Sequence, residues 1–345
     1  MMLRRAVLPL LLVLLGASEA SRAGYVFTAI DFPGAPTTLA LGINDAGLIV
    51  GIYFDTSGIE HGFLKSGSSL TPIDVPGSTF TQVDGINDVG QIVGGFGDST
   101  GFRHGFLKSG SSFTQLDVPG ATVFTEAIGI NDAGLIVGAF SDTPGVEHGF
   151  LKSGSSYTAI DVPGAVTTDV LGINDAGQIV GRFGFGTGEP GFRFGFLNSG
   201  SSFTTIDFPG GARAIQANGI DAAGRIVGNY SEPEGIVSPC NLTESMDTGV
   251  GPACTNQASS LLHAYLLEGS SFTQLDFPGA IGTLGIGIND AGVIVGGFFD
   301  STGTLHGYVA NPVPEPSTWA LTTIGALILL VYIRHDRLQI HRGRH

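Results

Sequence analysis

The chain repeats one ten-residue phrase six times. GINDAGLIVG occupies residues 42–51, and close relatives of it begin at Gly85, Gly129, Gly172, Gly219 and Gly287. Successive copies are spaced by 43, 44, 43, 47 and 68 residues, and the longest interval contains an insertion at residues 236–262. Self-similarity at such a period predicts repeated supersecondary units that bury their apolar faces against one another.

Two further landmarks return with the same period. The sequence Asp-x-Pro-Gly begins at Asp31, Asp74, Asp117, Asp161, Asp207 and Asp276. An element that reads His-Gly-Phe or a close variant begins at His61, His104, His148, His263 and His306. In the fourth unit, Phe194 stands in place of the histidine.

Within one unit the apolar residues alternate with period two, and Gly, Pro, Asn, Asp and Ser bound each run, as expected for strands and turns. In the third unit the pattern predicts strands at 113–118, 123–130, 135–140 and 147–152. Four strands per ~43 residues match the blade of a β-propeller. We therefore expect an all-β fold, a six-bladed propeller, with a β-solenoid of the parallel β-helix type as the second choice.

The two ends of the repeat region predict how the ring closes. The region begins on a strand at residues 25–31 and ends on a strand at 306–310, and elsewhere a tight Gly-Ser-Ser hairpin joins these two strand types. The first strand should therefore complete the last blade and close the ring without a free strand edge.

The repeated decamer is expected to be a hairpin. Asn44 and Asp45 favour the start of a turn because their side chains bond nearby backbone amides, and Gly47 suits a left-handed position. A cation site is the functional alternative for these residues, but the spacing of a calcium loop is absent.

The histidines and acids of the repeats suggest chemistry. His61, His104, His148, His263 and His306 hold one equivalent position. If this strand is third from the axis, these histidines lie roughly 10 Å outside the innermost strand, too far apart to share a metal. We expect structural histidines that bond a turn aspartate or carbonyl. Acids taken as equivalent could meet at the axis and support a glycan hydrolase or lyase: Asp45, Asp88, Asp132, Asp175, Asp221 and Asp290.

No catalytic residue, metal ligand or cofactor is assigned from the sequence, because no nucleophile elbow, phosphate loop or metalloprotease helix is present. Cys240 and Cys254 both fall in the insertion, and we expect them to form a disulfide. Of 15 basic and 30 acidic residues, eight and 27 lie between positions 24 and 312, a net charge of −19. The negative electrostatic potential of so acidic a region disfavours nucleic acid as a partner.

The ends of the chain predict export. Arg4 and Arg5 precede an apolar run and then small residues, which is typical of a secretory signal at residues 1–23. Residues 313–345 place Val-Pro-Glu-Pro before a short apolar stretch at 319–333 and a basic tail. Basic residues after an apolar span keep that side in the cytoplasm, so the body would lie outside the inner membrane.

This tail, with Val313, Pro314, Glu315 and Pro316 as its motif, resembles the PEP-CTERM sorting signal of Gram-negative bacteria. The resemblance implies recognition by an exosortase, transient contact with the inner membrane through 319–333, and release or transfer to the cell surface. The repeats resemble the extracellular HAF-repeat family, which implies export and a repeat architecture. From these resemblances we expect a non-catalytic binding or scaffold protein associated with extracellular polysaccharide; a glycan-active enzyme and a purely structural surface protein are the alternatives.

Overall fold

The computed structural model describes residues 24–186, 193–200, 202–208, 213–231 and 262–313. The predicted signal 1–23, the insertion up to residue 261 with both cysteines, and the tail from Pro314 onward lie outside these ranges. Within them no helix is long and apolar enough to cross a membrane, and the predicted span 319–333 is not among them.

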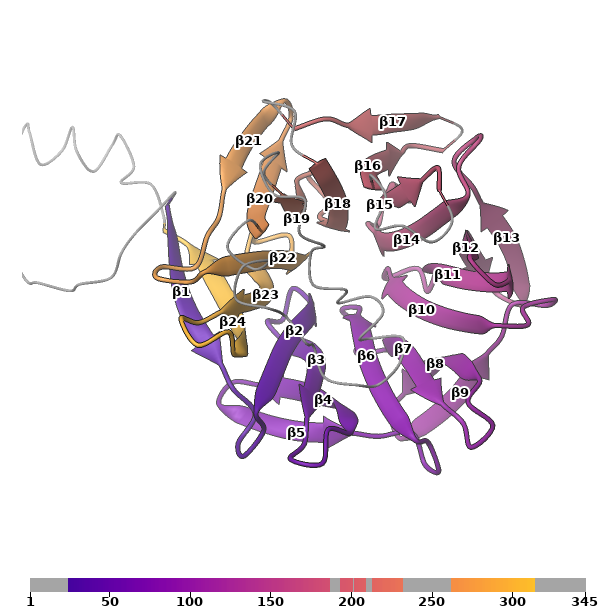
Figure 1. Ribbon diagram of the computed structural model, residues 1–345, viewed down its shortest axis with the longest axis horizontal. Coiled ribbons are helices and arrows are strands. Elements are labelled where there is room, and N and C mark those ends of the chain that lie inside the picture. Colours follow the sequence, from indigo (N-terminus) through magenta and orange to yellow (C-terminus); the bar gives the residue numbers. More distant parts are fainter. Residues whose placement is uncertain (1–23, 187–192, 201, 209–212, 232–261, 314–345) are drawn as a thin grey trace, which may run out of the picture.

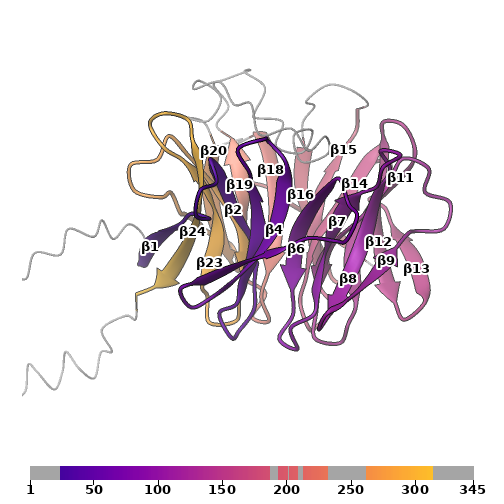
Figure 2. The ribbon, with the colours of Figure 1, turned by 90° about the horizontal axis from the view of Figure 1, so that it is seen from below.

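The described strands form six blades around a central axis (Figure 1), and the ring is seen from its side in Figure 2. Each blade is an antiparallel sheet of four strands. This architecture confirms the predicted six-bladed propeller and excludes the β-solenoid.

In every blade the first strand lies nearest the axis and the fourth lies at the rim (Figure 1). The first three blades comprise β2 (Thr37–Ile43), β3 (Ile49–Phe54), β4 (Glu60–Ser66) and β5 (Ser69–Ile73); β6 (Phe80–Ile86), β7 (Ile92–Gly97), β8 (Arg103–Ser109) and β9 (Ser112–Leu116); and β10 (Phe124–Ile130), β11 (Ile136–Thr143), β12 (Val146–Ser153) and β13 (Ser156–Ile160).

The fourth and fifth blades comprise β14 (Thr167–Ile173), β15 (Ile179–Gly184), β16 (Arg193–Asn198) and β17 (Phe203–Ile206); and β18 (Arg213–Ile220), β19 (Ile226–Ser231), β20 (Leu262–Glu268) and β21 (Ser271–Gln274). The sixth blade comprises β22 (Gly282–Ile288), β23 (Ile294–Phe299), β24 (Leu305–Pro312) and, as its outermost strand, β1 (Tyr25–Ile30).

The ring closes as the sequence predicts. β1 pairs antiparallel with β24, in a register that runs from Tyr25 opposite Pro312 to Ile30 opposite Gly307. Phe27 of β1 packs against Tyr308 and Phe277, with ring centroids 5.5 and 5.7 Å away. The start of the described chain therefore supplies the rim strand of the last blade.

The core lies between successive blades rather than in one central mass. Val50 and Ile73 of the first blade pack with Val83 and Phe106 of the second, and all four are buried. Similar clusters fill the other seams. Each third strand contributes one fully buried aromatic ring, and these are Phe63, Phe106, Phe150, Phe196, Tyr265 and Tyr308.

The decamer forms the hairpin between the first and second strands of each blade. In the first blade the amide of Gly47 donates to the carbonyl of Asn44 (3.0 Å), and Asn44 pairs with Leu48 (3.1 Å). Gly47 has a φ of 75°, a left-handed conformation that favours glycine. The hairpin predicted from the repeated sequence is thus the turn that points toward the axis.

Candidate functional site

The asparagine of the decamer joins each blade to the next. Asn44 Oδ1 accepts from the amide of Leu48 (2.9 Å), while Asn44 Nδ2 donates to the carbonyl of Asn87 in the second blade (3.1 Å). Equivalent amide-to-carbonyl bonds of 2.9–3.1 Å follow from Asn87, Asn131, Asn174 and Asn289, and the last of these reaches Asn44. The first and last repeats are therefore linked directly at the axis.

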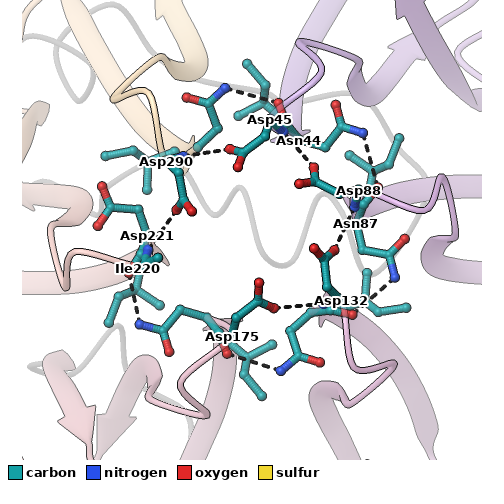
Figure 3. A pocket seen from close by; sticks show the side chains of 18 residues that line it. Asn44, Asp45, Asn87, Asp88, Asp132, Asp175, Ile220, Asp221 and Asp290 are labelled. Atoms are coloured by element: carbon teal, nitrogen blue, oxygen red, sulfur yellow. Dashed lines mark hydrogen bonds between the residues drawn. The ribbon is translucent and has the colours of Figure 1, made fainter.

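The aspartate of the decamer makes a second set of bonds between blades. The amide of Asp45 donates to Asp88 Oδ1 (2.8 Å), and the amide of Asp290 donates to Asp45 Oδ1 (2.8 Å). Asp132 and Asp175 accept from the preceding blades in the same way, at 2.8 and 2.9 Å. The carboxylates surround the central opening, as Figure 3 shows, and each of them accepts a hydrogen bond from a neighbouring hairpin.

The fifth blade departs from this scheme and corrects one sequence expectation. Asp221 is not equivalent to the other five aspartates; it occupies the asparagine position, and Ala222 occupies the aspartate position. The amide of Ala222 donates to Asp290 Oδ1 (2.8 Å), as an aspartate amide does elsewhere. Asp221 stands two residues after Gly219, as Asn44 stands two residues after Gly42, so it was wrong to group Asp221 with the five aspartates.

The ring of hairpins surrounds a small cavity of ≈ 90 Å³, which is lined by the Ile, Asn and Asp residues of these hairpins and by Ala222 (Figure 3). Burial raises the pKa of Asp45, the bond from the Asp290 amide lowers it, and the carboxylates of Asp290, Asp88 and Asp132 raise it further. Among the described residues no group of three or more His, Cys, Asp or Glu side chains is arranged to hold a metal ion.

The repeated histidines lie on the third strand from the axis, away from this cavity. Each histidine directs Nδ1 at the aspartate of the Asp-x-Pro-Gly turn that ends its own blade. The pairs are His61 with Asp74 (2.9 Å), His104 with Asp117 (2.8 Å), His148 with Asp161 (3.1 Å), His263 with Asp276 (2.9 Å) and His306 with Asp31 (2.7 Å).

A second aspartate faces the other nitrogen in four of these blades. His61 Nε2 lies 3.6 Å from Asp55, and the same contact joins His104 to Asp98 (3.4 Å). It recurs in His148 with Asp142 (3.8 Å) and His306 with Asp300 (3.5 Å). Because the two acids face opposite nitrogens of one ring, they do not converge on a point where a single ion or substrate atom could sit.

The sequence analysis missed two buried clusters of charge. Arg103 pairs with Glu126 and donates to Gln82 (2.5 Å), and these side chains join the second and third blades. In the fourth blade Asp169 accepts from Arg182 (2.5 Å) and Arg193 (3.0 Å). A signal was available: the residue before the His position reads Glu60, Arg103, Glu147 and Arg193 in four successive units, an alternation of charge.

Solved structures of propeller proteins and of a sialidase are similar to most of this chain at low identity. A fucose-specific lectin of the fungus Aleuria aurantia, described as a six-bladed β-propeller, is 14% identical, with 82% of this chain and 98% of the lectin covered and a TM-score of 0.46. The β-propeller domain of the Trilobed protease from Pyrococcus furiosus is 8% identical over 82% of this chain and 97% of that domain, with a TM-score of 0.42. Trypanosoma rangeli sialidase is 9% identical, with 87% of this chain and 57% of the sialidase covered and a TM-score of 0.43.

No family model matches the chain, and no curated protein is similar to it. Because these TM-scores lie below 0.5, the fold is assigned from the strands and their pairing in this chain. The class defined by the fold and the axial hydrogen bonds is a six-bladed β-propeller whose polar axial residues connect its blades.

Proposed function

We propose that this protein is exported and acts at the cell surface or in the extracellular matrix as a non-catalytic binding or scaffold protein for exopolysaccharide. Export, recognition by an exosortase and transient contact with the inner membrane rest on the sequence at the two ends of the chain. The −19 charge between residues 24 and 312 disfavours nucleic acid and anionic lipid surfaces as partners.

One observation carries the non-catalytic part of this proposal. The acids that gather at the axis, where a propeller enzyme could place catalytic carboxylates, use an oxygen to accept a backbone amide from the neighbouring blade. A carboxylate that fixes two blades is held in one position and supports the ring. The axial aspartates therefore serve the stiffness of the scaffold.

A glycan hydrolase or lyase is the second candidate, and one observation favours it. Glycan cleavage commonly uses a carboxylic acid whose raised pKa keeps it protonated, together with a second carboxylate. The pKa of Asp45 is raised and Asp88 adjoins it, so this pair is the strongest place to look for such chemistry.

The variant Asp45→Asn separates the two candidates. Asparagine keeps an oxygen that can accept from the Asp290 amide, so the fold is retained while acid catalysis is removed. Purified protein and variant are incubated with exopolysaccharide from the producing organism, and bound polymer and newly formed reducing or unsaturated ends are both measured. Equal binding and no new ends from either protein support the scaffold. New ends that disappear in the variant would establish the enzyme.

A further inference from the structure

The fourth blade breaks the polar pattern at the His position. At the end of the second strand, four blades carry an aspartate, and these are Asp55, Asp98, Asp142 and Asp300. The fourth blade carries Phe185 there, directly after β15, and Phe194 replaces the histidine at the start of β16. Of the Asp-His-Asp arrangement only the last acid, Asp207, remains.

Phe185 is an exposed ring with a fixed support. It is 59% exposed, whereas Phe183 beneath it is 5% exposed. The Phe185 centroid lies 5.5 Å from that of Phe183 at an interplanar angle of 90°, and 6.1 Å from that of Phe194 at 61°. Edge-to-face contacts of this kind hold a ring in place, so a ligand that stacks on Phe185 need not order it first.

Asp207 offers a carboxylate on the other side of Phe194 from Phe185, by equivalence with the first blade. In the first blade the equivalent positions 55 and 74 flank His61 on either side, at 3.6 and 2.9 Å. By this equivalence Phe185 and Asp207 flank Phe194. Asp207 is exposed, and a phenyl ring cannot donate the hydrogen bond that a histidine gives its aspartate in the other blades.

We propose that Phe185 and Asp207 form a binding site for a neutral sugar ring, so that the fourth blade is where the protein holds its polysaccharide. This site rests on the proposed function above. The apolar C–H face of a pyranose stacks on an exposed aromatic ring, and sugar hydroxyls donate to a carboxylate. The acidic charge of residues 24–312 disfavours an anionic polymer, and a neutral sugar is the occupant to which the site is suited.

Two variants of the full protein test the site. Phe185→Ala removes the exposed ring. The double variant with Phe185→Asp and Phe194→His rebuilds the Asp-His-Asp arrangement of the first three blades and the sixth. Because four blades of this protein already contain that arrangement, the double variant should fold. Val89→Ala is the matched control, because Val89 is 70% exposed but belongs to an axial hairpin.

Binding is measured by co-sedimentation with exopolysaccharide from the producing organism and with a neutral glucan, dextran, as a defined probe. Loss of one stacked ring should weaken binding roughly tenfold in both variants, while the control binds as the unmodified protein does. Thermal unfolding of each variant verifies that it is folded.

The outcomes separate this site from the proposed function. If the unmodified protein binds and both folded variants bind equally well, the fourth-blade site is wrong while the polysaccharide role stands. If the unmodified protein binds neither polymer, the proposed function fails and the site fails with it. Weakened binding in the control as well would overturn the site, because the loss would then not be specific to the fourth blade.

Discussion

Arg225 donates from its guanidinium to the carbonyl oxygen of Asp290, 3.0 Å away, and so connects the fifth blade to the sixth. Between the other blades an asparagine side-chain amide crosses the seam instead, and it donates to the carbonyl at the asparagine position of the next blade. In the fifth blade Asp221 holds the asparagine position and its carboxylate cannot donate; Arg225 pairs with Asp221 (2.5 Å) and donates across the same seam. Two linked sequence changes thus keep a side-chain hydrogen bond across this seam, with its acceptor moved to the next residue, Asp290.

Arg225→Ala should destabilise the protein by about 3 kcal/mol, because it leaves the buried carboxylate of Asp221 without its cation and removes the bond to Asp290. The free energy of unfolding in urea measures the change.

The matched control restores the residues of the first repeat. The double variant Asp221→Asn with Arg225→Leu reproduces Asn44 and Leu48, and it should recover most of the lost stability. A double variant as unstable as Arg225→Ala would show that the two residues act independently.

Substitution of an axial asparagine such as Asn131 should cost more stability than substitution of an axial aspartate. Asn131→Ala removes a donor to Asn174 and an acceptor for Leu135, both buried or half-buried, and should cost about 2 kcal/mol. The neighbouring exposed change Asp132→Asn keeps the oxygen that accepts from Asp88 and should cost under about 0.5 kcal/mol. Urea unfolding of both variants gives the comparison, and equal costs would contradict the assigned roles.

Stability should fall as pH rises from about 4 to about 8. Burial, and then the charge of Glu126, raise the pKa of Asp84 well above its usual value. The Asp169 charge, and then burial, raise the pKa of Glu147 to about 8. A carboxyl whose pKa is higher in the folded state contributes stability below its unfolded pKa of about 4, and this is lost as pH rises through the folded value.

The opposite sign applies at lower pH. Bonds from Thr100 and Thr302 hold the pKa of Asp98 and of Asp300 at about 2, so their contribution is present above about pH 4 and lost toward pH 2. We expect the highest melting temperature near pH 4 to 5 in a series from pH 2 to 9.

Asp84→Asn provides the control for the alkaline side, since asparagine has similar shape and no proton to lose. Its melting temperature should match that of the unmodified protein near pH 4 and exceed it at pH 9. Asp207→Asn, at an exposed acid, should follow the unmodified protein throughout. A constant difference between Asp84→Asn and the unmodified protein at every pH would contradict the buried neutral acid.

Removal of residues 25–30 should cost much of the stability, because this strand supplies the whole rim of the last blade and the ring contacts of Phe27. The truncated protein is compared with one in which Thr28 and Ala29, both exposed on β1, are exchanged for serine. Thermal unfolding at the same temperature for all three proteins would mean that the closing strand contributes nothing.

The fold was predictable because several independent features of the repeated sequence indicate the same four-stranded blade. Three features indicate the same blade: the spacing of Gly42 and its equivalents, the alternation of apolar residues and the turn residues. The strand at 306–310 lacks a following strand in its own repeat, which indicates that the first strand of the chain pairs with it. In the third unit the predicted strand 123–130 differs from β10 by a single residue.

What the sequence could not supply is how blades face one another. A period of two says which residues share a face, but not that Asn44 reaches across a seam to Asn87, or that Arg103 meets Glu126. The Asp221 error has another origin, because the sequence already places Asp221 two residues after Gly219, as Asn44 stands two residues after Gly42, and the bond from Ala222 to Asp290 agrees with this. The predicted disulfide and the sorting motif beyond Val313 lie outside the described residues and stay predictions.

The most direct test incubates the purified protein with exopolysaccharide from its own producing organism and measures bound polymer and new chain ends in the same sample. The account predicts that the protein sediments with the polymer and that no reducing or unsaturated ends form over time. New ends that increase with protein concentration, or a protein that stays in the supernatant, would contradict it.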